Sequence, residues 1–154
     1  MIIDYYGIPF GGQLLIWTSR IAFYGSCRTT PNKYEAIDIA YSKIGIKGGS
    51  YLFKPFIEIL KNKKNFIIQP FCKRYLNKTE INLINCIEYN KNESYDNEYF
   101  IKEWELDKQK KEFNFYTRKI ANYFIEVKLE TDIYRSNNYL VRQKTDELNL
   151  KTLH

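Results

Sequence analysis

Residues 122–130 read NYFIEVKLE, and apolar side chains alternate with polar ones along this stretch. Successive side chains of a β-strand point to opposite faces, so this period of two predicts an amphipathic strand over 123–130. Glu126 and Lys128 would then share the solvent-facing side of the strand. The apolar residues expected in the core are Tyr123, Ile125, Val127 and Leu129.

Three neighbouring runs show a similar period and are separated by polar, turn-forming residues. Together with 123–130 they predict an antiparallel β-meander over about residues 99–144. The predicted strands are 99–106, 112–118, 123–130 and 139–144, with turns at 107–111, 119–122 and 131–138.

The N-terminal half favours helices instead. Thr30 is a good N-cap and Pro31 suits the first helical position, and apolar residues then recur at helical spacing. We expect one helix over 31–44, a turn at Gly48 and Gly49, and a second helix over 51–61. The predicted fold class is α+β, in which two N-terminal helices cover the antiparallel meander in a single domain of residues 1–154.

The remaining segments are less regular. Residues 13–24 are apolar on both sides of a short polar break that contains Arg20, which suggests a buried hairpin or one long strand. Pro70 interrupts an apolar run at 66–75, as in an edge strand. For 79–89 we predict a short helix, with a strand as the alternative.

The residue composition narrows the possible chemistry. The three cysteines show no CxxC spacing, and the only histidine is the terminal His154, so neither a zinc site nor histidine-based catalysis is expected. We predict no metal and no cofactor. The N-terminus lacks the features of a signal peptide and no apolar run could span a bilayer, so we expect a cytoplasmic protein without a membrane partner.

Charge is distributed unevenly along the chain, whose formal net charge is +6. Residues 1–77 hold 11 basic and 4 acidic side chains, whereas residues 78–154 hold 13 and 14. The 54–78 segment is the most basic part, and such a segment can attract an acidic partner, including nucleic acid. The residues predicted to bind are Lys61, Lys63, Lys64, Lys73, Arg74 and Tyr75.

The pair Glu126 and Lys128 resembles the Glu-x-Lys end of the PD-(D/E)xK nuclease motif. This resemblance implies a divalent cation held by the glutamate and an upstream acid, while the lysine polarises the attacking water. Asp107 is the nearest candidate for that acid, and Glu58 could add a ligand. Alternatively, Glu126 belongs to a solvated strand face opposite Arg118 or Arg142.

Two functions therefore follow from the sequence. The first is a small non-enzymatic protein that binds a macromolecule, most simply another protein, and acts by occluding it, as inhibitors, immunity proteins and phage counter-defence proteins do. Its support is a tyrosine-rich composition with few catalytic side chains. The alternative is a nucleic-acid-binding protein that uses the basic 54–78 segment, or a divalent-metal nuclease that uses Asp107, Glu126 and Lys128.

Overall fold

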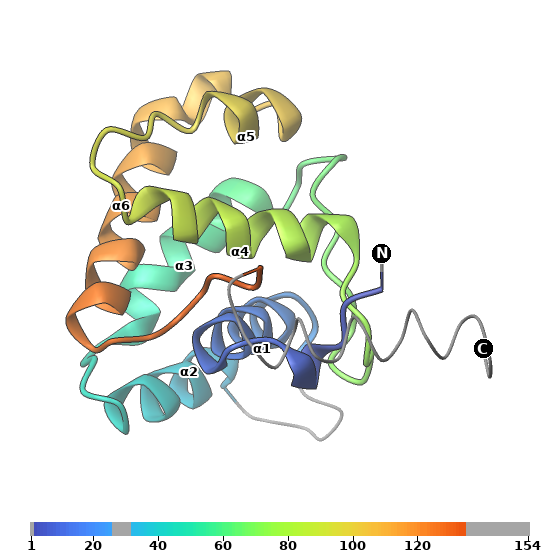
Figure 1. The fold of residues 1–154 in the computed structure, drawn as a ribbon, viewed down its shortest axis with the longest axis vertical. Helices are drawn as coiled ribbons and strands as arrows, with labels where there is room; N and C mark the ends of the chain where they lie inside the picture. The colour runs from blue at the N-terminus through green and yellow to red at the C-terminus, as the bar shows by residue number, and fades with distance from the viewer. Residues whose placement is uncertain (1, 26–31, 135–154) are drawn as a thin grey trace.

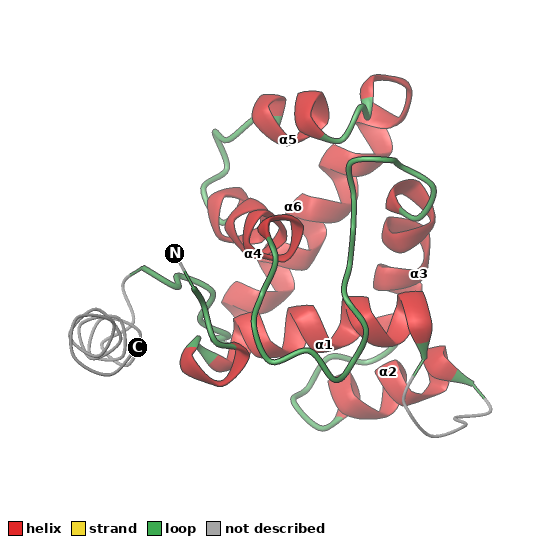
Figure 2. Ribbon diagram, turned by 90° about the vertical axis from the view of Figure 1, so that its right-hand side faces the viewer, coloured by secondary structure: helices red, strands yellow, loops and turns green. Residues whose placement is uncertain are grey.

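The computed structural model describes residues 2–25 and 32–134 of the chain. Within these ranges the protein is helical, and no strand longer than a single bridge is present (Figures 1 and 2). In chain order the elements are η1 (Tyr5–Gly7), α1 (Phe10–Tyr24), α2 (Lys33–Ser42), α3 (Gly49–Leu60), α4 (Lys78–Asn90), α5 (Glu98–Glu103), η2 (Asp107–Gln109) and α6 (Lys110–Glu126).

The predicted β-meander is wrong for the described residues. Its first strand overlaps α5, and its second strand and half of its third lie in α6, while 139–144 lies outside the described residues. Because the buried positions of α6 recur every three or four residues, they form one face of a helix. The Phe, Tyr and Ile residues favour strands only weakly, and tertiary packing overrides that preference. Those buried positions are Phe113, Thr117, Ile120, Ala121 and Phe124.

The stretch 122–130 ends this helix rather than forming a strand. Phe124 is fully buried and Ile125 is 49% exposed, the reverse of the alternation expected for a strand. Lys128 adopts a left-handed φ of 58°, and the backbone N–H of Leu129 donates to the carbonyl of Phe124 at 2.8 Å. This hydrogen bond is typical of a Schellman ending. The chain then turns back toward α1 (Figure 1).

Helix α1 is the central helix of the fold, where a hairpin or strand was predicted. It packs against α2, α3 and α4, and it is buried on most of its surface. A mostly apolar helix that is buried on several sides is typical of such a position. The hydroxyls of Thr18 and Ser19 donate to the carbonyls of Leu14 and Leu15, one turn earlier, which satisfies these polar atoms within the core.

Three predicted helices are present. Helices α2, α3 and α4 overlap the segments predicted at 31–44, 51–61 and 79–89, so the strand alternative for the last is excluded. The role assigned to the first two is wrong, since the described residues contain no sheet for them to cover. Instead, α2 packs on α3, and α3 and α4 both pack on α6.

A cluster of aromatic rings joins the second half of the chain to the rest of the core. Trp104 is fully buried and packs edge-on against Phe66, with ring centroids 4.9 Å apart. It also contacts Phe100 and Phe113. These large rings explain how α5 and the 61–77 loop are held together without a sheet.

A buried polar network fixes the loop between α4 and α5. The side-chain amide of Asn97 donates to Asn114 at 2.9 Å and to Thr117 at 2.8 Å, and Asn90 donates to Asn97 at 2.6 Å. Asn97 is 1% exposed and has a left-handed φ of 62°. Burial raises the pKa of the neighbouring Cys86 thiol well above its usual range, so this side chain stays neutral.

The 61–77 segment is a long loop that runs beside α1 and then returns to α4 (Figure 2). The strand predicted at 66–75 is wrong, apart from a single antiparallel bridge between Asp4 and Tyr75. Backbone hydrogen bonds of 2.8 and 2.9 Å flank this bridge. It brings the N-terminal segment and residues 71–74, which are far apart in the sequence, to the same face of the protein.

Replacing Gly11 with alanine is expected to lower the free energy of unfolding by about 1–3 kcal/mol. A Cβ atom at Gly11 would overlap the backbone carbonyl of Glu130, which cannot move without displacing the C-terminal segment. Gly12→Ala is the matched control, because its Cβ would meet only the ends of flexible side chains, the nearest 3.1 Å away on Ile8. Urea unfolding of both variants measures the difference. Equal losses would contradict the role of Gly11.

Candidate binding site

A buried ion pair connects α1 to the start of α4. The Nε of Arg20 donates to one carboxylate oxygen of Glu80 at 2.7 Å, and its Nη2 donates to the other at 3.0 Å. The side chains are only 2% and 0% exposed, respectively. Such a two-pronged contact fixes the plane of the guanidinium as well as its position.

Glu80 is held from several other directions. Its carboxylate accepts from the side chain of Gln69 at 2.6 Å and from the backbone N–H of Asn77 at 3.1 Å. The second contact completes a capping box, in which Asn77 caps α4. Glu80 therefore fixes the start of a helix, the preceding loop and the buried arginine together.

Arg20 also lines a cavity of about 440 Å³ between the N-terminal segment, α1 and the 61–77 loop. We call it the aromatic–basic cavity. Its aromatic residues are Tyr5, Tyr6, Trp17 and Phe71. The other lining residues are Gln13, Arg20, Cys72, Lys73 and Arg74.

The three cations of the cavity differ in how far their charge is balanced. Glu80 pairs with Arg20, and Asp4 pairs with Arg74 at 2.8 Å. The ammonium of Lys73 is exposed and has no acidic partner among the described residues, whereas its backbone carbonyl accepts from Nη1 of Arg20 at 2.5 Å. Among the described residues, the lining of the cavity thus holds an excess of about one positive charge, carried by Lys73.

Hydrogen bonds position the aromatic side of the cavity. The Tyr5 hydroxyl donates to the carbonyl of Gln13 at 3.1 Å, and the Gln13 side chain donates to the carbonyl of Ile8 at 3.0 Å. The Arg20 guanidinium carbon lies 5.8 Å from the centre of the Tyr5 ring. Burial raises the pKa of Tyr5, so it stays a neutral donor near neutral pH. Tyr6 is 71% exposed and Phe71 is 40% exposed.

The predicted binding residues are dispersed by the fold. Lys73 and Arg74 line the aromatic–basic cavity, and Tyr75 is the bridge residue beside them. Lys63 instead donates to the carbonyl of Glu105 and to Gln109. Lys64 lines a separate hollow with Asn65 and Asn77. Lys61 lies near Lys33, and burial together with the Lys61 charge lowers the pKa of Lys33.

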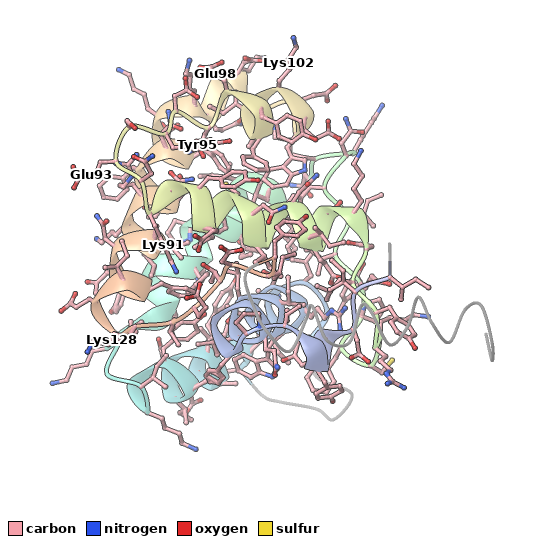
Figure 3. The ribbon with its side chains drawn as sticks, viewed as in Figure 1. Lys91, Glu93, Tyr95, Glu98, Lys102 and Lys128 are labelled. Carbon is pink, nitrogen blue, oxygen red and sulfur yellow. The ribbon has the colours of Figure 1, made fainter. Side chains whose placement is uncertain are left out.

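The residues of the nuclease alternative are not brought together. Asp107 lies in η2, before α6 begins, whereas Glu126 is the last residue of that helix. A helix of 17 residues separates its ends by about 25 Å. Glu126 and Lys128 are exposed, and Lys128 projects away from the body of the protein (Figure 3). Glu58 is exposed on α3.

Within the described residues, neither arginine predicted to lie opposite Glu126 is seen beside a strand. Arg118 donates to the carbonyl of Tyr95 and does not face a strand, and Arg142 lies outside the described residues. No group of three or more His, Cys, Asp or Glu side chains is arranged to hold a metal ion in the described part of the chain.

Sequence reasoning missed the residues that give the cavity its character, namely Tyr5, Tyr6, Trp17 and Arg20. One signal was present, because an arginine within an apolar run needs a buried partner. The partner itself lies 60 residues away, and no local pattern indicates Glu80.

The chain was compared with known proteins, and no family model, no curated protein and no solved structure matches it. None of the helices in residues 2–25 and 32–134 has the length and apolar character needed to cross a membrane.

Proposed function

We propose that this protein is a non-enzymatic binding protein that engages another protein through the aromatic–basic cavity and acts by occluding that partner's surface. The observation that carries the proposal is the lining of the cavity by tyrosine, tryptophan and arginine. These three residue types dominate the binding energy of protein interfaces, because each combines a large contact area with a polar group. The proposed setting is the cytoplasm, where an exposed thiol such as that of Cys72 stays reduced.

The surroundings of the cavity support this proposal. Tyr6 and Phe71 are partly exposed at the cavity, and Ile2, Phe10 and Tyr75 are exposed in the neighbouring segments. Exposed apolar side chains in neighbouring segments are typical of an interaction surface.

Single-stranded nucleic acid is the second candidate partner. Exposed rings beside cations can stack on bases while the cations contact phosphates, and Tyr6, Phe71 and Lys73 offer this combination. The dispersal of Lys61, Lys63 and Lys64 over other surfaces weighs against a long basic track, so we rank this candidate second.

Photocrosslinking tests the proposal. We expect p-benzoylphenylalanine at position 6 to form an adduct with a protein in extracts of the native host. The same residue at position 51 is the control, because Tyr51 is a tyrosine that is 87% exposed and does not line this cavity. The adduct should persist after nuclease treatment. Equal adducts at both positions would contradict the proposal, and a nuclease-sensitive adduct would favour the second candidate.

A further inference from the structure

The guanidinium of Arg20 has hydrogen-bonding capacity that the protein does not use. An arginine carries five N–H donors. Glu80 accepts from Nε and Nη2, and the carbonyl of Lys73 accepts from Nη1. One hydrogen on each of Nη1 and Nη2 therefore has no acceptor among the described residues. The side chain is nevertheless only 2% exposed. A buried donor without an acceptor is costly, so these hydrogens favour an oxygen atom placed beside them.

Because Arg20 lines the aromatic–basic cavity, we infer that this cavity is a receptor for one carboxylate group of the partner protein, supplied by an aspartate, a glutamate or a chain end. This inference rests on the proposed function and adds the chemistry of the partner to it. The oxygens of a carboxylate can accept from the unused hydrogens on Nη1 and Nη2. Lys73, an exposed residue of the cavity lining, supplies the balancing charge.

The site is also rigid before any partner arrives. Glu80 fixes the guanidinium plane, and Gln69 and Asn77 fix Glu80 in turn. A donor that is already in place loses little conformational entropy when it binds an anion. This arrangement makes Arg20 a better receptor than an exposed arginine with the same charge.

The charge of the cavity lining favours a single carboxylate over a nucleic-acid backbone. Within the described part of the chain, Glu80 pairs with Arg20 and Asp4 pairs with Arg74, so the lining has an excess close to one positive charge, from Lys73. A carboxylate carries one negative charge and satisfies this excess. A nucleic-acid strand requires a succession of cations along its backbone, and Lys61, Lys63 and Lys64 lie on other surfaces or are already engaged. The observations therefore favour a protein carboxylate over a phosphodiester chain.

Trp17 provides a fluorescent reporter within the cavity, since the chain has only one other tryptophan, the fully buried Trp104. The probe is the peptide acetyl-Gly-Phe-Glu-Phe-Gly-amide, added at up to millimolar concentration to the full chain. Its Phe residues can contact the exposed rings. We expect a saturable change in tryptophan emission that is absent in Trp17→Phe. The peptide with Gln in place of Glu should bind at least tenfold more weakly.

Variants of the protein provide the second part of the test. Lys73→Gln should weaken binding of the Glu peptide about tenfold. Lys102→Gln makes the same charge change on α5 and should leave the affinity unaltered. Figure 3 shows Lys102 projecting from this helix. The double variant Arg20→Met/Glu80→Gln removes the guanidinium without leaving a buried carboxylate, and glutamine still serves a capping box. This variant should lose binding while circular dichroism shows a folded protein. If this double variant does not fold, the inference is tested by the effect of Lys73→Gln and by the comparison of the Glu and Gln peptides.

Three results would overturn the inference. The first is no change in Trp17 emission with the Glu peptide, and the second is equal affinity for the Glu and Gln peptides. The third is saturable binding of an oligothymidylate of eight nucleotides without binding of the Glu peptide, which would identify a nucleic-acid site. A protein adduct at position 6 could still form in the first two cases, so failure here is distinguishable from failure of the proposed function.

Discussion

Replacing Glu80 with alanine is expected to lower the free energy of unfolding by about 3–5 kcal/mol, the usual effect of removing one partner from a buried ion pair. The change leaves the Arg20 guanidinium charged and buried without its carboxylate. It also removes the acceptor for Asn77 and Gln69, so α4 loses its capping box and the loop before it loses an anchor. Denaturant unfolding followed by circular dichroism measures the loss.

The appropriate control is Glu98→Ala. Glu98 pairs with Lys110 at the same distance of 2.7 Å, but both side chains are about half exposed. Water and salt screen such a pair, so its removal should change the unfolding midpoint very little. If Glu80→Ala and Glu98→Ala have similar effects, the buried pair does not hold α1 and α4 together in the way described above.

Replacing Asn97 with alanine is expected to cost about 2–5 kcal/mol. Of this, about 1–2 kcal/mol comes from placing a Cβ-bearing residue without a compensating side chain in the left-handed region. About 1–3 kcal/mol comes from the buried polar atoms of Asn90 and Thr117 that lose their partner. Thermal or urea unfolding gives the total, and amide hydrogen exchange over 91–97 should increase in parallel.

Asn97→Gly separates the two contributions. Glycine adopts a φ of 62° without strain, so it removes the hydrogen bonds but not the favourable backbone conformation. It should be more stable than Asn97→Ala by about 1 kcal/mol. A glycine variant less stable than the alanine variant would show that the left-handed backbone at this position carries no strain.

The accuracy of sequence-based prediction differed along the chain for a physical reason. In α3 the apolar residues recur at a clear helical spacing after two glycines, and the helix was predicted at its observed place. In α6 the aromatic and branched residues also satisfy a period of two near its end, where Tyr123, Ile125 and Val127 alternate. Burial of Phe124 decides between the two periods, and burial is a property of the tertiary structure.

The candidate site shows the same limit. Lys73, Arg74 and Tyr75 lie together because they are close in the sequence, and they were predicted as binding residues. Their aromatic neighbours Tyr5, Tyr6 and Trp17 come from the N-terminal segment and α1, which the Asp4–Tyr75 bridge, the Asp4–Arg74 ion pair and the Arg20–Lys73 hydrogen bond join to this loop. A cavity assembled from segments about 60 residues apart leaves no local pattern in the sequence. Its function as a binding site remains a prediction.

Residues 129–133, which follow α6, pack against the first helix, and this affects the order in which the chain can fold during its synthesis. The side chain of Lys91, which Figure 3 labels at the end of α4, donates to the carbonyl of Leu129 at 2.9 Å. Ile133 is fully buried, and the carbonyl of Glu130 lies against Gly11 at the start of α1. The first helix is thus covered by almost the last residues that the structure describes.

A nascent chain that stops before Leu129 already contains the sequence of every described helix, but it lacks the segment that packs on α1. Contacts between residues so far apart in the sequence form late, and an uncovered apolar helix is prone to association in the meantime. While the chain is still attached to the ribosome, α1 should therefore remain sensitive to protease, and it should become resistant only after residue 133 has emerged.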